Sequence, residues 1–187
     1  MNPSTEDILK AVHATPAKVV FVLPNNKNII MAAEQTVPLA DRRVVVIPTR
    51  TVPQGISAML AYDPDGSLAD NYDTMTDVMG NVETGQITFA ARDSEFGGHK
   101  IKEGEILALD NGKLTFTEKD IEKAAVRLAK QMFKHNHVFL TLIYGEGVSA
   151  EQAEKTGKAI ETKIGNGVEV SVVYGGQPVY YYIISIE

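Results

Sequence analysis

The sequence predicts a parallel α/β subdomain over residues 1–62, followed by a smaller mixed-sheet α+β subdomain over residues 63–187. Two continuous runs of β-branched residues, each followed by a helical pattern, are typical of parallel strands covered on both faces. A turn at residues 63–66 marks where this pattern stops, and Asn111-Gly112 further on indicates an antiparallel hairpin. Helices between hairpins are typical of an α+β arrangement. Part of the C-terminal strands could rejoin the first sheet instead.

Strand and helix signals alternate through the first subdomain. Ser4 is a good N-cap, and Glu6 and Asp7 favour the positive end of a helix that continues to about residue 14. Pro53 suits the first position of a later helix. The remaining elements are expected at residues 19–23 (strand), 28–37 (helix), 43–47 (strand) and 54–61 (helix).

The second subdomain has two strong helix signals. Thr117 is predicted to cap an amphipathic helix whose apolar face carries Ile121, Ala124, Ala125, Leu128 and Met132. Ser149 and Gln152 form a capping box for a helix that ends near Gly165. The other elements are expected as a helix at 68–83, a strand around 87–91, a loop at 96–99, hairpin strands at 105–109 and 113–117, and strands at 138–144, 168–174 and 180–186.

The composition limits the chemistry that this chain can perform. It has no cysteine, which excludes disulfides and thiolate sites and fits a cytoplasmic location. We expect no signal peptide, and the longest apolar runs are too short to span a membrane as helices. The formal net charge is −6, and residues 62–83 contain six acids and no base. That segment is better explained as a solvated face than as a surface for a basic partner. Without a basic stripe, nucleic acid is not expected as a partner.

Polar turns follow both predicted strands of the first subdomain. The carboxyl ends of parallel strands form the usual ligand or partner crevice of such sheets. An arginine in such a loop can bind a carboxylate or phosphate through two hydrogen bonds. Each residue could equally serve only to cap a helix or fix a turn. The candidate residues of this edge are Asn25, Asn26, Lys27, Asn28, Arg50, Thr51 and Gln54.

Three other motifs are better explained by local structure than by chemistry. The segment GEGVSA at 145–150 fits a dinucleotide fingerprint formally, but its glutamate would lie beside the pyrophosphate. The segment DPDG at 63–66 begins like a calcium loop, but its glycine comes too early. His135 and His137 could supply two metal ligands, but no acid lies at a convincing spacing. We therefore expect no metal site and no catalytic residue.

Several segments together carry a resemblance to a known family. They occur in the order MNPSTED (1–7), LPNNKNI (23–29), PTRTVPQG (48–55), YGEG (144–147) and YGGQP (174–178). With them the chain closely resembles the C-terminal part of the catalytic component of bacterial fatty acid kinase, which is a dihydroxyacetone kinase-like protein. The resemblance covers essentially the whole chain. It implies a fold similar to the DegV-like fatty-acid-binding proteins, with an α/β domain joined to a smaller α+β domain.

The resemblance also implies partners. In that family a separate kinase domain binds ATP and metal through an Asp-Gly-Asp-Thr-Gly type motif, which this sequence lacks. No cofactor is therefore expected in this chain, and no catalytic residue is carried over. The implied partners are a fatty-acid-binding protein of the DegV family and the other domains of the parent kinase. Residues 2–5 look similar to the loop that holds the fatty acid carboxylate in lipid-binding relatives, so Ser4 and Thr5 are candidate carboxylate ligands.

Three functions follow as hypotheses. The first is a non-catalytic module that docks the fatty-acid-binding protein, so that the separate kinase domain can phosphorylate the bound fatty acid. The second is a lipid-binding module that holds a fatty acid between its subdomains, with Ser4 or Thr5 at the carboxylate. The third is an enzyme acting on a small phosphorylated or carboxylated metabolite, for which no acid/base pair can be named. A homodimer is an open alternative for the oligomeric state.

Overall fold

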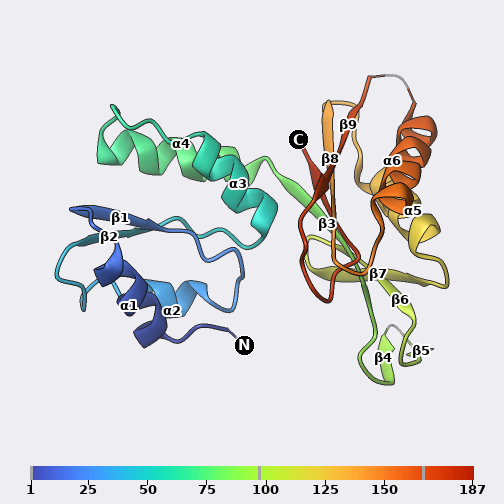
Figure 1. Ribbon diagram of the computed structural model, residues 1–187, viewed down its shortest axis with the longest axis horizontal. Coiled ribbons are helices and arrows are strands. Elements are labelled where there is room, and N and C mark those ends of the chain that lie inside the picture. The colour runs from blue at the N-terminus through green and yellow to red at the C-terminus, as the bar shows by residue number, and fades with distance from the viewer. Residues whose placement is uncertain (1, 97, 166) are drawn as a thin grey trace. The chain divides into compact units, whose positions relative to one another are not determined.

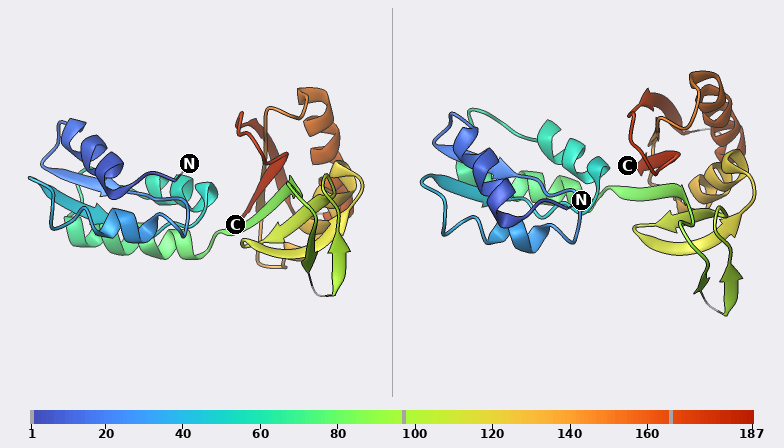
Figure 2. Two further views of the ribbon diagram at one scale, coloured as in Figure 1. Left: turned by 90° about the horizontal axis from the view of Figure 1, so that it is seen from below. Right: turned by 60° about the horizontal axis from the view of Figure 1, so that its bottom comes forward.

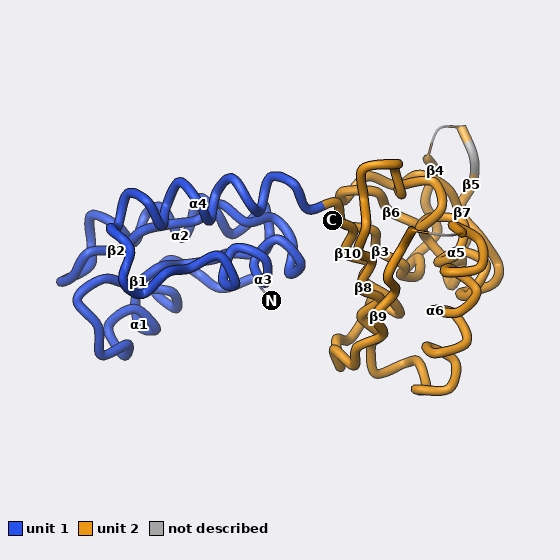
Figure 3. The backbone as a smooth tube through the Cα atoms, turned by 90° about the horizontal axis from the view of Figure 1, so that it is seen from above, with its two compact units in different colours: residues 1–82 blue, residues 83–187 orange. Residues whose placement is uncertain are grey.

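The computed structural model describes residues 2–96, 98–165 and 167–187, and the chain divides into two compact units (Figures 1 and 3). The units are Met1–Val82 and Glu83–Glu187, so the division lies twenty residues beyond the predicted boundary. The second unit is also the larger of the two, although it was expected to be the smaller.

The displaced boundary has a physical cause in helix α4 (Leu68–Gly80). The Asn71 side chain on this helix accepts a hydrogen bond from the Asp63 N–H at 2.8 Å and donates to the Asp63 carbonyl at 2.8 Å. The 63–66 turn is thereby bound to α4, and Met75 of α4 shares a core cluster with Ala58 of α3 (Val52–Leu60). The turn therefore joins two packed helices of one unit and is not a linker between units.

The first unit is built around two parallel strands, β1 (Val19–Val22) and β2 (Arg43–Val46). Side chains that alternate along them contribute to two separate core clusters. Helices α1 (Thr5–Ala14) and α2 (Ile30–Glu34) lie on one side of these strands, and α3 and α4 lie on the other (Figure 1). One cluster packs the strands against α1 and α2, and the other packs them against α3 and α4. Parallel strands covered on both faces are thus confirmed. The helix α2 is shorter than predicted.

The second unit contains a six-stranded sheet in the order β7-β6-β3-β10-β8-β9. Only β8 and β9 pair in parallel, and the other neighbours are antiparallel. The strands are β3 (Glu83–Phe89), β6 (Ile106–Asp110), β7 (Lys113–Glu118), β8 (Phe139–Tyr144), β9 (Glu169–Tyr174) and β10 (Tyr182–Ile186). All five residues of β10 are buried, because it pairs with β3 and β8. The C-terminal strands β9 and β10 therefore do not rejoin the first sheet.

Two helices, α5 (Ile121–Met132) and α6 (Ala150–Ile164), lie on one side of this sheet (Figures 1 and 2). Their buried side chains, such as Leu128 and Ile160, pack with alternate residues of the strands in a single core cluster. The capping box of α6 is confirmed, with Ser149 and Gln152 bonded reciprocally. The N-cap of α5 is Asp120 and not Thr117, because β7 continues to Glu118.

Turn chemistry explains the hairpin between β6 and β7. Asn111 and Gly112 both have positive φ, at 48° and 78°, as a two-residue turn of this kind requires. The expected loop at 96–99 belongs instead to a small second hairpin, β4 (Ser94–Phe96) and β5 (His99–Ile101). Residue 97 of that expected loop lies outside the described residues.

Candidate functional site

The two polar loops predicted to form an edge are bonded to each other at the carboxyl ends of β1 and β2. The Asn25 N–H donates to Thr49 Oγ1 at 3.0 Å, and the Thr49 hydroxyl donates back to Asn25 Oδ1 at 2.8 Å. Thr49 is completely buried. This reciprocal pair joins loops that are 24 residues apart in the chain, so the predicted candidates on the two loops do lie at one edge.

Asn25 has an unusual backbone conformation, and its side chain packs against a glycine. Asn25 has a φ of 55°, in the left-handed region that asparagine tolerates better than most residues. Its side chain lies directly against Gly55 of α3, where an added Cβ would collide with Asn25 Oδ1. A glycine at this position therefore lets α3 approach the β1 loop.

The N-terminus of α3 is closed by two further candidates. Thr51 is the N-cap and accepts a hydrogen bond from the Gln54 N–H at 3.3 Å. Gln54 Oε1 accepts from the Arg50 N–H at 2.8 Å. These bonds satisfy backbone donors at the start of the helix and fix the direction of the loop. Thr51 and Gln54 thus cap a helix and fix a turn, which is the structural alternative given for these candidates above.

The remaining candidates differ in what they present outward. Asn26 Oδ1 accepts from the Asn28 N–H at 2.9 Å, which fixes the β1 loop in a local turn. Lys27, Asn28 and Arg50 are exposed. The edge therefore consists of two loops fixed by hydrogen bonds, with the cationic side chains of Lys27 and Arg50 exposed on it.

Ser4 and Thr5, the candidate carboxylate ligands, donate their hydroxyl hydrogens elsewhere. The Ser4 hydroxyl donates to Asp7 Oδ2 at 2.8 Å within the capping box of α1, and the Thr5 hydroxyl donates to Gln35 Oε1 at 2.9 Å. The hydrogen bonds from Ser4 hold the pKa of the Asp7 carboxyl below its usual value. A fatty acid carboxylate would have to displace these bonds, and the assignment of Ser4 and Thr5 stays a prediction.

The paired histidines are explained by packing. His137 is buried, its Nδ1 accepts the Lys134 N–H at 2.9 Å, and its ring packs edge-on against Phe133. His135 is exposed. Across residues 2–96, 98–165 and 167–187, no three His, Cys, Asp or Glu side chains are grouped so as to hold a metal ion.

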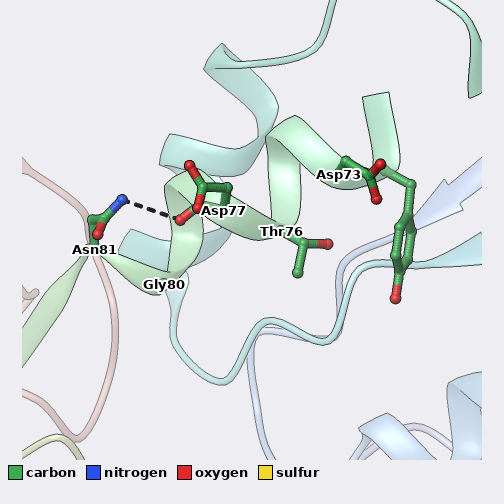
Figure 4. A pocket seen from close by; sticks show the side chains of 6 residues that line it. Asp73, Thr76, Asp77, Gly80 and Asn81 are labelled. Atoms are coloured by element: carbon green, nitrogen blue, oxygen red, sulfur yellow. Dashed lines mark hydrogen bonds between the residues drawn. The ribbon is translucent and has the colours of Figure 1, made fainter. Parts of the chain in front are cut away.

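An open hollow lies along α4 in the acidic segment (Figure 4). Asp73 and Asp77 line it with Tyr72 and Thr76, and Asn81 donates a hydrogen bond to the Asp77 carbonyl at 3.2 Å. Both aspartates are exposed, as expected of a solvated helix face.

Sequence reasoning missed two residues of the edge, Thr49 and Gly55. Both lie inside the polar 48–55 segment, but neither was a candidate because each acts on a residue of the other loop. Thr49 follows Pro48 in the turn after the apolar run, and no local pattern marks it as different from an ordinary turn threonine. For Gly55, a glycine within the first turns of a predicted helix, where it weakens the helix, indicated a close approach.

Comparison with known proteins now gives the family. The family model for the FakA-like C-terminal domain of fatty acid kinase matches residues 1–187. The chain belongs to this family. It is 42% identical over its whole length to Protein YloV of Bacillus subtilis and 40% identical to a protein of Staphylococcus haemolyticus. In both cases it spans only 34% of the relative, so it corresponds to about a third of their length.

Solved structures show that the fold of this fatty acid kinase family member is DegV-like. A DegV family protein from Corynebacterium glutamicum matches with a TM-score of 0.66 at 16% identity, over 99% of this chain and 82% of that one. The fatty acid kinase B3 protein of Streptococcus pneumoniae, loaded with linoleic acid, matches with a TM-score of 0.67 at 11% identity, over 99% and 76%. A dihydroxyacetone kinase operon co-activator matches with a TM-score of 0.57 at 15% identity, over 98% and 70%. The predicted family and the DegV-like fold are both confirmed.

Within the described part of the chain, no helix has the length and apolar character needed to cross a bilayer.

Proposed function

We propose that this chain is a non-catalytic docking module of a fatty acid kinase. It binds a fatty-acid-binding protein of the DegV family, so that a separate kinase domain of the parent protein can phosphorylate the bound fatty acid with ATP and metal. Membership of the FakA-like C-terminal family supports the assignment to such a kinase. The observation that carries the docking role is the reciprocal Asn25–Thr49 pair, which makes one fixed edge from two loops.

A fixed edge favours docking for an entropic reason. Ordering loops and side chains on association costs free energy, and loops that are already bonded to each other avoid much of that cost. Lys27 and Arg50 project from this base as exposed cations. We therefore expect the partner to present acidic groups, with the cations raising the association rate and setting the orientation of the complex.

The test is isothermal titration of the chain with a purified DegV-family fatty-acid-binding protein, with and without bound fatty acid. Lys27→Ala combined with Arg50→Ala should weaken binding by about tenfold, corresponding to about 1.4 kcal/mol. The matched control is Lys18→Ala with Arg43→Ala. These residues are also exposed cations but lie at the opposite, amino ends of β1 and β2. Equal affinities for the two double variants would overturn the assignment of the edge.

A lipid-binding module is a second candidate because of the fold. The matching protein of Streptococcus pneumoniae carries linoleic acid. Native mass spectrometry of the purified chain, with and without added fatty acid, separates the two candidates. An acyl chain retained at one molecule per chain, and lost in Ser4→Ala with Thr5→Val, would support lipid binding. A chain that retains no fatty acid under these conditions would exclude it.

A further inference from the structure

Helix α3 exposes its large apolar side chains and buries its small ones. Val52, Ile56, Met59 and Leu60 have exposed fractions of 45%, 46%, 66% and 83%. Their spacing of four, three and one residues puts all four on one face of the helix. The buried residues of the same helix are Pro53, Gly55, Ser57 and Ala58. A surface helix in a monomer normally shows the reverse arrangement, so this apolar stripe of α3 suits an interface.

Charges of opposite sign border the stripe at its two ends. No charged residue lies between Arg50 and Asp63 in the sequence. Arg50 is exposed just before α3, and Asp63 and Asp65 are exposed just after it. The Asp65 N–H donates to Asp63 Oδ1 at 2.9 Å, which orders this acidic turn. Neither Arg50 nor Asp65 forms an ion pair with another described residue.

Three of the four stripe residues are evenly spaced about Ile56, and charges of opposite sign lie at similar distances on its two sides. Val52 lies four residues before Ile56 and Leu60 lies four residues after it, while Arg50 precedes it by six and Asp63 follows it by seven. If a second α3 is laid antiparallel on the first, Ile56 meets Ile56 and Val52 meets Leu60. Each Arg50 then faces the acidic turn of the other copy. This is the self-complementary pattern that a two-fold interface requires.

We propose that the apolar stripe of α3 is a self-association surface, on which a second copy of this chain packs antiparallel about a two-fold axis at Ile56. The helix has nine residues and is therefore about 13 Å long. An interface centred on one such helix per copy lies at the small end of protein interfaces. The resulting dimer is weak and reversible, and it forms at high protein concentration.

A cysteine placed on the axis tests this geometry directly, because the chain has no cysteine of its own. Helix axes pack 8–10 Å apart and the Cα atoms lie about 2.3 Å from each axis, which leaves facing Cα atoms roughly 3.5–5.5 Å apart, a range that overlaps that of disulfides. Under mild oxidation, Ile56→Cys should form a disulfide-linked dimer much faster than Met31→Cys. Met31 is also a highly exposed apolar side chain, with an exposed fraction of 70%, but it lies on α2.

Sedimentation equilibrium gives the second measurement. The unmodified chain should show a concentration-dependent dimer at up to about 1 mM, the weak end of the affinity scale. Ile56→Glu should remain a monomer, Arg50→Asp should weaken the dimer, and adding Asp65→Arg to Arg50→Asp should restore it. A chain that stays monomeric throughout, with Ile56→Cys linking no faster than Met31→Cys, overturns the proposal. No partner protein is present in either experiment, so this outcome leaves the docking function untouched.

Discussion

Asn25 combines three roles at one residue: a left-handed backbone conformation, a reciprocal bond to Thr49 and close contact with Gly55. Gly55→Ala should therefore force the Asn25 side chain away and destabilise the chain by about 1–3 kcal/mol in urea unfolding. Gly80→Ala is the matched control, because Gly80 also lies in a helix but has no atom within 4 Å of the added methyl group. If both variants unfold at the same urea concentration, the Asn25 side chain is not fixed against α3.

A second prediction at the residue scale concerns His137 and the dependence of stability on pH. Burial, with the nearby charge of Lys134, lowers the pKa of its imidazole below the ordinary value of 6.5. As the pH falls through about 6.5, the unfolded chain takes up a proton at this residue while the folded chain does not. The unfolded state then binds more protons, so this contribution to stability is lost as the pH falls from about 6.5 towards the folded pKa.

The test of the His137 prediction is the free energy of unfolding as a function of pH. His137→Asn removes the titration but keeps a side-chain acceptor for the Lys134 N–H, so it should flatten the profile between pH 7 and 5. His135→Asn, at the exposed neighbouring histidine, serves as the control. Parallel profiles for the original chain and His137→Asn would contradict the prediction.

At the scale of elements, the start of α5 shows how a local signal can be misplaced. Both Thr117 and Asp120 are acceptable caps by residue type, and the strand β7 decides between them because it occupies Thr117. Asp120→Ala should cost about 1 kcal/mol, while Asp120→Asn should cost much less, because asparagine can also accept the Lys123 N–H. Urea unfolding measures both. If Thr117→Ala destabilises the chain more than Asp120→Ala does, the helix begins where the sequence indicated.

Elements that depend on neighbouring residues were predictable from the sequence. The Ser149–Gln152 capping box and the Asn111-Gly112 turn satisfy their own backbone within a few residues, so their residue types were sufficient. Features decided by distant contacts were not. Helix α4 belongs to the first unit because of hydrogen bonds between Asn71 and Asp63. Strand β10 is central in its sheet because it pairs with two strands that are far away in the sequence.

The same distinction applies to the candidate site. Polar residues after two neighbouring parallel strands were enough to predict a common edge. The bond that joins its loops involves Thr49, a residue that no local pattern distinguishes from an ordinary turn threonine. The outward cations Lys27 and Arg50 were named from the sequence. Only the hydrogen bonds of the structure distinguish these two exposed residues from the candidates that fix the loops.

At the scale of the whole molecule, each core cluster lies entirely within one of the two units. Two clusters belong to residues 1–82 and the third, larger one to residues 83–187. Because a cooperative unfolding unit generally has its own core, we expect two such units in this chain. Gly55→Ala should then speed amide hydrogen exchange only in the first unit, and Asp120→Ala only in the second.

Hydrogen exchange monitored by mass spectrometry resolves this directly, because peptides report on each unit separately. In the double variant Gly55→Ala with Asp120→Ala, the increase in exchange within each unit should equal that of the corresponding single variant, since distant independent sites are additive. A single variant that speeds exchange equally in both units would show that the two cores unfold together. In that case the Gly55→Ala variant could not be used to weaken the docking edge alone.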